Sequence, residues 1–131
     1  MEILLLEDDD HLRFTYEQVL EDAGHSVRAM GSMRSACTSI LDTPPDLLIL
    51  DLFIEGEHSI PVADLAGYAV PEADVIYVTG SSQFPNGELY QISPNASWVL
   101  RKPVDLAQLR DLVAHAAQSG RHASHPPRPT H

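Results

Sequence analysis

The chain has 131 residues, 44% of them hydrophobic and 6% aromatic, which fits one globular domain with a single core. Nineteen Asp and Glu residues against eight Lys and Arg residues give a formal net charge of -11. This charge repels nucleic-acid backbones and anionic membrane surfaces, so we expect neither as a partner. The N-terminal run MEILLLEDDD lacks the basic flank of a signal peptide, and no apolar run approaches the roughly 18 residues of a membrane span, so we expect a cytoplasmic protein.

Short apolar runs alternate with amphipathic segments along the chain. The expected strands are residues 3–6, 26–30, 46–52, 75–80 and 98–102. The expected helices are residues 10–23, 33 to about 43, 61–68, and 105–119, with room for only a short helix around residues 88–92. In the second helix, the apolar residues Met33, Cys37, Ile40 and Leu41 are expected to share the inner face.

This alternation of strand and helix predicts an α/β fold in which a parallel sheet is built with right-handed crossovers. Residues 120–131 carry three prolines and three histidines but no large apolar side chain, so we expect a disordered tail after a domain over residues 1–119. In a sheet of this kind, ligands bind beyond the carboxyl ends of the strands. The chemistry should therefore be sought at those ends.

Reactive or charged residues stand at the ends of four expected strands. Glu7 and Asp8 follow the first strand, Asp51 ends the run of the third, Thr79 that of the fourth and Lys102 that of the fifth. Each pair of carboxylates would repel by about 4 kcal/mol at 4 Å and an effective dielectric near 20, so a cation should lie among them. Oxygen ligands without imidazole or thiolate favour a hard cation, and Mg²⁺ is the most available one.

Such a site can transfer a phosphoryl group. The Asp51 carboxylate would be the nucleophile, Lys102 would neutralise a phosphoryl oxygen, and Thr79 would donate a hydrogen bond to the same group. The competing interpretation is structural, because acids that precede a helix, as residues 7–10 do, also cap it and interact favourably with its dipole.

The segments ILLLEDD, PDLLILDL, VIYVTGS and LRKP resemble the receiver domain of response regulators in two-component systems, over residues 1 to about 119. The resemblance implies a flavodoxin-like doubly wound sheet of five parallel strands in the order 2-1-3-4-5, here with a shortened or degenerate fourth helix. It implies a signalling domain and not an enzyme in the usual sense, one that assists its own phosphoryl transfer and dephosphorylation. It also implies a phosphodonor, either a sensor histidine kinase or a histidine phosphotransfer protein, and an unknown downstream protein.

The resemblance further implies a role for each site residue. Asp51 accepts the phosphoryl group and, with Asp8 and the Phe53 carbonyl, holds Mg²⁺, while Glu7 acts through water. Thr79 shifts toward the phosphate, Lys102 pairs with it, and the Lys102–Pro103 bond is cis.

The chain departs from the family pattern at three positions. Glu55 replaces a proline four residues after the phosphoacceptor, Phe53 is bulky, and Val99 stands where an aromatic switch residue is usual. Trp98 lies on the opposite side of the strand from Val99. We therefore expect signalling through a surface other than the one formed by the fourth helix, the fifth strand and the fifth helix.

Three functions remain open from the sequence. The first is a stand-alone receiver in a magnesium-dependent phosphorelay. The second is a degenerate receiver that binds partner proteins without phosphate. The third is a phosphohydrolase of the haloacid dehalogenase type, in which Asp8 and Asp10 would act as nucleophile and acid, although no threonine follows two residues after Asp10.

Overall fold

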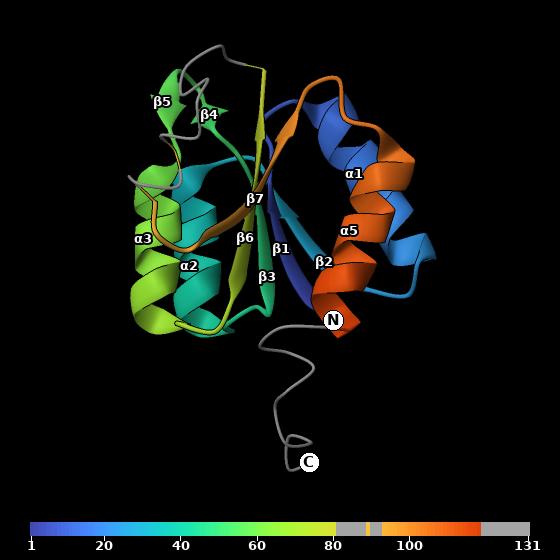
Figure 1. Cartoon of the computed structure of the whole chain (residues 1–131). Helices are drawn as coiled ribbons and strands as arrows, with labels where there is room; N and C mark the ends of the chain where they lie inside the picture. Colours follow the sequence, from blue (N-terminus) through green and yellow to red (C-terminus); the bar gives the residue numbers. More distant parts are fainter. Residues whose placement is uncertain (81–88, 90–92, 119–131) are drawn as a thin grey trace.

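A parallel sheet forms the centre of the molecule (Figure 1). The computed structural model describes residues 1–80, 89 and 93–118. The strands of the sheet are β1 (Glu2–Leu6), β2 (Ser26–Met30), β3 (Leu47–Asp51), β6 (Asp74–Thr79) and β7 (Ala96–Arg101). Their order, β2-β1-β3-β6-β7, is the expected 2-1-3-4-5 order, because β4 and β5 form a separate two-stranded hairpin. The flavodoxin-like topology is therefore confirmed.

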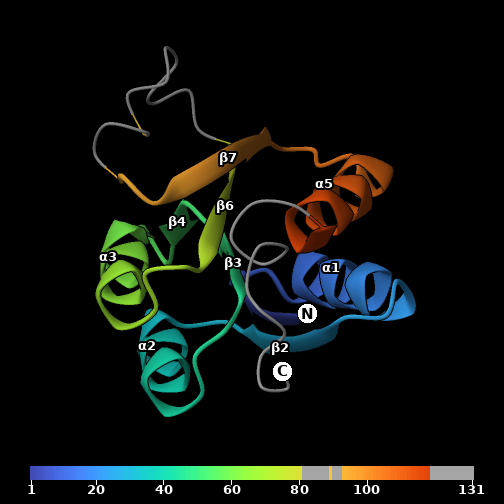
Figure 2. The ribbon, with the colours of Figure 1, turned by 60° about the horizontal axis from the view of Figure 1, so that its bottom comes forward.

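Among the described residues, helices cover both faces of the sheet (Figure 2). The helices α1 (Asp10–Asp22) and α5 (Leu106–Gln118) lie on one face, and α2 (Met33–Asp42) and α3 (Ile60–Ala69) lie on the other. Polar side chains fix where three of these helices begin, since Asp9, Ser32 and Asp105 each accept a hydrogen bond from the backbone N–H three residues later. Gly24, at φ +98°, takes the chain out of α1.

The core has two halves because successive strand residues point to opposite faces of the sheet. Under α2 and α3 lie Leu4, Leu6, Leu48, Leu50, Val75 and Tyr77; under α1 and α5 lie Ile3, Leu5, Leu47, Ile49, Ile76 and Val78. The central strands are buried on both faces, which explains their unbroken apolar runs. Each such aliphatic side chain contributes about 1.5–3 kcal/mol by burial, so the sheet is a firm support for the residues at its strand ends.

A hairpin follows β3, where the sequence predicted only a loop. Its strands, β4 (Phe53–Ile54) and β5 (Glu57–His58), pair antiparallel. The two turn residues between them, Glu55 and Gly56, have φ values of +52° and +84°, as in a type I′ turn. Two-residue strands are too short to give a periodic signal, and a glutamate in a left-handed conformation is unusual.

One prediction about helix α2 is wrong. The expected inward position of Leu41 is wrong, because the buried stripe of α2 is centred on Ala36 and Ile40, and Leu41, about 100° further round the helix, is 65% exposed. Two expected segments lie outside the described residues: the tail at residues 120–131, and the short fourth helix at residues 88–92 apart from Leu89, which is buried.

No helix in the described part of the chain is long and apolar enough to cross a membrane.

Candidate phosphoacceptor site

Three carboxylates meet at the carboxyl edge of the sheet. Glu7 and Asp8 directly follow β1, and Asp51 is the last residue of β3, the neighbouring strand. One oxygen of each of the three lies within 4.8 Å of the others. Glu7 and Asp51 are buried and Asp8 is exposed, so the cluster opens to solvent on one side only. The expectation that these acids converge is confirmed.

Lys102, which directly follows the edge strand β7, brings a positive charge into this cluster. Its Nζ lies 3.0 Å from Asp51 Oδ2 and 3.1 Å from Glu7 Oε1. The backbone N–H of Lys102 donates to the Thr79 carbonyl at 2.9 Å, and the peptide bond to Pro103 is cis, as the resemblance implies. Burial alone would lower the pKa of Lys102, but the hydrogen bond and charge of Asp51, followed by those of Glu7, raise it above its usual value. The ammonium is thus charged throughout the physiological range.

One ammonium does not satisfy the two buried carboxylates. Burial is the main cause that raises the pKa of Glu7, from 4.5 to about 7, with the Asp51 charge also raising it, against the opposing effects of the Asp9 N–H and Lys102. Glu7 Oε2 accepts from the Asp9 N–H at 3.0 Å, while the buried Oε1 has only the Lys102 ammonium beside it, at 3.1 Å, and this ammonium also donates to Asp51. Two buried carboxylates that share one ammonium cost free energy, which a proton or a further cation would offset. The donor set, all oxygen, fits a hard divalent cation.

The two remaining predicted site residues flank Asp51. Thr79 ends β6, is buried, and stands one residue beyond Val78, which pairs with Asp51 across the two strands. Phe53 begins the hairpin, and its backbone N–H donates to Asp51 Oδ1 at 3.3 Å, while its side chain packs against the core under α2 and α3. The bulk of Phe53 therefore points into the protein and does not fill the space beside the carboxylates.

The structure adds two residues that sequence reasoning missed. The hydroxyl of Ser59, fully buried, donates to the Asp51 carbonyl at 2.6 Å, and the Glu55 N–H at the hairpin turn donates to Asp8 Oδ2 at 2.9 Å. Both contacts depend on the hairpin, which folds the chain back toward β3. A serine eight residues after an aspartate carries no local signal, so only the hairpin itself could have revealed it.

A third missed residue holds the other side of the cluster. Arg13 of α1 donates through Nη1 to the Glu7 carbonyl at 2.9 Å and pairs with Asp10. Gly31 makes room for this guanidinium, because a Cβ there would lie 2.8 Å from Arg13 Nη1. Asp10, the acid of the hydrolase alternative, is thus an exposed partner of Arg13 and does not belong to the carboxylate cluster.

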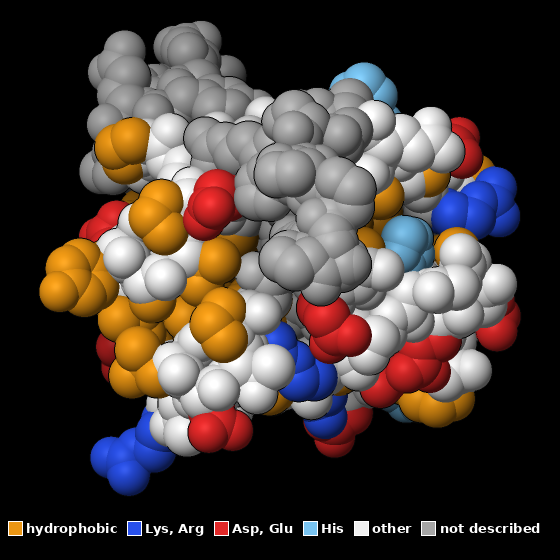
Figure 3. Space-filling view, turned by 90° about the horizontal axis from the view of Figure 1, so that it is seen from below, with side chains coloured by type: hydrophobic (Ala, Val, Ile, Leu, Met, Phe, Trp, Pro, Cys, Tyr) orange, Lys and Arg blue, Asp and Glu red, His pale blue; other side chains and the backbone are white. Residues whose placement is uncertain are grey.

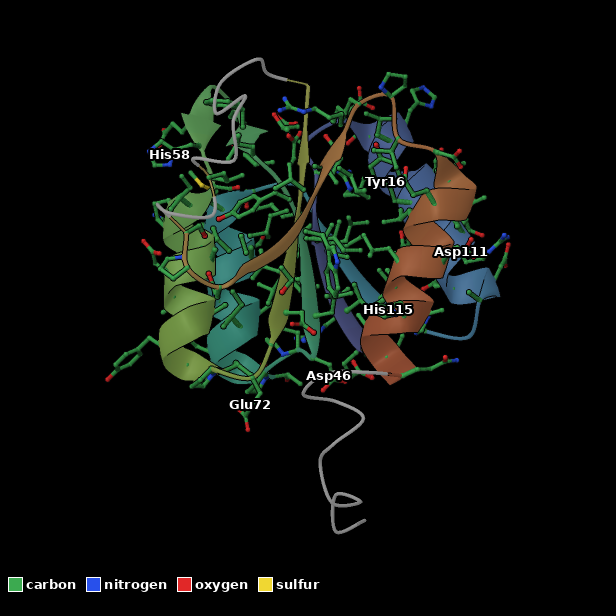
Figure 4. All side chains as sticks on the ribbon, viewed as in Figure 1. Tyr16, Asp46, His58, Glu72, Asp111 and His115 are labelled. Atoms are coloured by element: carbon green, nitrogen blue, oxygen red, sulfur yellow. The ribbon has the colours of Figure 1, made fainter. Side chains whose placement is uncertain are left out.

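Other acidic and titratable side chains lie elsewhere on the molecule (Figure 4). Asp46 and Glu72 lie at the opposite edge of the sheet, and Asp111 and His115 lie along α5. Tyr16, on α1, lines a groove of about 470 Å³ together with Lys102, Pro103 and Leu106 among others. The residues that line this groove are mostly apolar, and Lys102 belongs to both the groove and the carboxylate cluster.

The chain is a flavodoxin-like α/β domain with an acidic cluster at the carboxyl edge of its sheet, and comparison with known proteins identifies the family. Residues 3–114 match the response regulator receiver domain, so the chain belongs to that family. The response regulator receiver protein CpdR of Brucella abortus (strain 2308) is 31% identical over 114 residues, which cover 85% of this chain and 89% of that protein.

Solved structures agree in fold. The signal receiver domain of a putative LuxO repressor protein from Vibrio parahaemolyticus is 27% identical with a TM-score of 0.78, covering 88% of each chain. A CheY-like response regulator receiver domain protein from Methanospirillum hungatei JF-1 has the same TM-score at 21% identity, covering 86% of this chain and 89% of that one. The chain is therefore a signalling domain of two-component systems and not a conventional enzyme. Domains of this family interact with histidine kinases or phosphotransfer proteins.

Proposed function

We propose that this domain accepts a phosphoryl group on Asp51 from a phosphohistidine of a sensor histidine kinase or a histidine phosphotransfer protein, in a reaction that needs Mg²⁺. The observation that carries the proposal is the joint approach of Asp51, Glu7 and Asp8 with the Lys102 ammonium 3.0 Å from the presumed nucleophile. A structural role in helix capping accounts for Asp9, which caps α1, but not for the buried Glu7 and Asp51.

The residues that would hold the cation are Asp8, Asp51 and the Phe53 carbonyl, with Glu7 acting through water. When bound, Mg²⁺ supplies positive charge that screens the carboxylates and the phosphoryl oxygens. The hairpin keeps Asp8 in place through the Glu55 N–H, and the Asp9 N–H keeps Glu7 in place. The excess of negative charge supports this assignment, since Glu7, Asp8 and Asp51 converge around the single ammonium of Lys102.

In the transfer step, a carboxylate oxygen of Asp51 attacks phosphorus, and the P–N bond to the donor imidazole breaks. The bonding pair leaves with the imidazole nitrogen, and the phosphoryl group becomes an acyl phosphate on Asp51. Lys102 moves its ammonium from the carboxylate to a phosphoryl oxygen, and the Thr79 hydroxyl donates to another. The same groups would assist the later attack of water, which restores the carboxylate.

The proposal is tested with the purified chain and acetyl phosphate or a phosphorylated donor domain. We expect one phosphoryl group per chain, mapped by mass spectrometry to Asp51, formed with MgCl₂ and lost with EDTA. Asp51→Asn abolishes the labelling, and Lys102→Met reduces it by about two orders of magnitude or more, because an electrostatic contact to the transferring group is lost. Asp111→Asn, a change to an exposed acid on α5, is the matched control and leaves it unchanged.

Three results would contradict the proposal. Undiminished labelling of Asp51→Asn would place the phosphoryl group elsewhere. Labelling of Asp8 with turnover of phosphate esters would favour the hydrolase alternative. Absence of any labelling, together with a partner whose affinity ignores both Asp51→Ala and beryllofluoride with Mg²⁺, would favour a phosphate-independent binding module.

A further inference from the structure

The outer face of α3 is apolar although it faces solvent. The ten residues of this helix, IPVADLAGYA, include one charged side chain, Asp64. Its inner residues are buried, while Pro61, Leu65 and Tyr68 recur at i, i+4 and i+7; Pro61 and Tyr68 are exposed, Tyr68 to 87%, and Leu65 is half-buried between them at the edge of the core. A single exposed aromatic residue needs no explanation, but a helix that is apolar on all sides normally lies inside a protein or against another one.

A hollow of about 330 Å³ lies beside this stripe. It is lined by Ala63, Asp64, Gly67, Pro71, Pro94 and Asn95. Asn95 Nδ2 donates to the Ala63 carbonyl at 2.8 Å, and a Cβ at Gly67 would come within 3.2 Å of that nitrogen, so the small residues let the chain before β7 pack tightly on α3. The hollow therefore has a firm floor, with the Asp64 carboxyl in its wall. Asp64 forms no ion pair with another described residue.

The charge around α3 has one sign. Residues 35–100 contain no lysine and no arginine. The acidic residues of this stretch are Asp42, Asp46, Asp51, Glu55, Glu57, Asp64, Glu72, Asp74 and Glu88. Arg28 and Arg34 lie on the other side of α2, where they line a separate hollow with Thr38 and Ser39. The acids nearest α3 along the chain are Glu57, Asp64 and Glu72, and residues 35–100 contribute no Lys or Arg to offset them, so this face attracts a cationic partner and repels a second copy of itself.

Figure 3 agrees with this description, since it shows hydrophobic side chains gathered on the side of the molecule formed by α3 and α2. We propose that the α3 surface, meaning Pro61, Leu65, Tyr68 and the hollow at Asp64, is a docking surface for a protein segment with apolar side chains on one face and Lys or Arg residues beside them. The apolar side chains cover the stripe around Tyr68, and a basic side chain enters the hollow and pairs with Asp64. This surface is separate from the carboxylate cluster, and its occupation does not require phosphoryl transfer.

The test uses the full chain labelled with ¹⁵N and a synthetic helical peptide built of leucine on one face and lysine on the other. We expect the amide signals that shift most to be those of α3 and of residues 93–95. Tyr68→Ser and Asp64→Asn each weaken binding by about tenfold or more, as loss of a central aromatic or charged contact does. Tyr68→Phe retains binding, which separates loss of the ring from loss of the hydroxyl.

Matched controls come from the other face of the sheet. Phe14→Ser removes an aromatic residue of α1 that is 62% exposed, and Asp111→Asn removes an exposed acid of α5; each changes the affinity by less than about twofold. A peptide with glutamate in place of lysine, and one with serine in place of leucine, do not bind measurably. Thermal unfolding of all five variants matches that of the unmodified chain, since the altered side chains lie outside the core.

Several outcomes would overturn the proposal. Equal weakening by Tyr68→Ser, Asp64→Asn, Phe14→Ser and Asp111→Asn would mean that the peptide is attracted to the acidic protein in general. Amide shifts concentrated away from α3 would contradict the proposed location of the surface. Undiminished binding of the glutamate peptide would contradict the proposed charge of the partner. A dimer in sedimentation that Tyr68→Ser abolishes would make a second copy the occupant, and no binding at millimolar peptide would leave the surface without this partner.

Discussion

Glu7 makes the stability of the metal-free protein depend on pH. Its pKa in the folded state is about 7 against an ordinary value of 4.5, mainly because the side chain is buried. The folded protein therefore holds this proton more tightly than the unfolded chain does. The stabilising contribution is fully present below pH 4.5, decreases as the pH rises between these two values, and is lost above about pH 7.

The size of the effect follows from the same two values. A difference of about 2.5 pH units, at about 1.4 kcal/mol each, corresponds to roughly 3 kcal/mol of folding free energy. Glu7→Gln removes the titration and keeps the shape of the protonated side chain. We therefore expect the free energy of unfolding of the unmodified protein to fall between pH 4.5 and 8, relative to Glu7→Gln, by roughly 3 kcal/mol.

Urea unfolding in EDTA, followed by circular dichroism, measures this difference at several pH values. The comparison between the two proteins cancels the other titrating groups, as long as their surroundings are unchanged. Glu2→Gln, a change to an exposed glutamate of the same strand, is the control and should follow the unmodified protein. Parallel pH profiles for Glu7→Gln and the unmodified protein would refute the reasoning, because Glu7 would then titrate alike in both states.

Three further predictions concern residues around the site. Ser59→Ala leaves the buried Asp51 carbonyl without its hydroxyl donor, and should cost about 1–3 kcal/mol in urea unfolding; no loss would mean that the bond is not formed. Tyr77→Phe removes the hydrogen bond between the Tyr77 and Ser93 hydroxyls and should cost about 1 kcal/mol in urea unfolding. Because burial raises the pKa of Tyr77 to about 12, an ultraviolet titration should show one late-ionising tyrosine fewer in this variant than in the unmodified protein. Glu55→Asn suits the left-handed conformation at φ +52° and should raise the melting temperature, corresponding to about 0.5–1 kcal/mol, unless the turn is not of the assigned type.

The sequence was sufficient to predict the positions of the strands and of the residues at their ends. Both depend on local patterns: unbroken apolar runs mark strands buried on both faces, and parallel strands bring their carboxyl ends to one edge. Once Glu7, Asp51 and Lys102 each end or follow such a run, the topology alone makes them neighbours. Their proximity therefore follows from the order of the strands, without knowledge of any contact between side chains.

What the sequence could not show depends on pairings across short or irregular segments. The hairpin of β4 and β5 is too short for a period-two pattern, and its partner contacts, Ser59 with Asp51 and Glu55 with Asp8, follow only from its geometry. The exposure of Leu41 depends on how α2 is rotated against its neighbours, because an apolar residue at the edge of a helical stripe can lie on either side of the boundary. The absence of Lys and Arg from residues 35–100 is visible in the sequence, but the sequence alone does not show that Asp64 lines a hollow beside the exposed Tyr68.

The bond from Ser59 to the Asp51 carbonyl joins the start of α3 to the phosphoacceptor strand. A helix of ten residues is about 15 Å long and does not bend easily, so any tilt at its start is carried along its length to Tyr68.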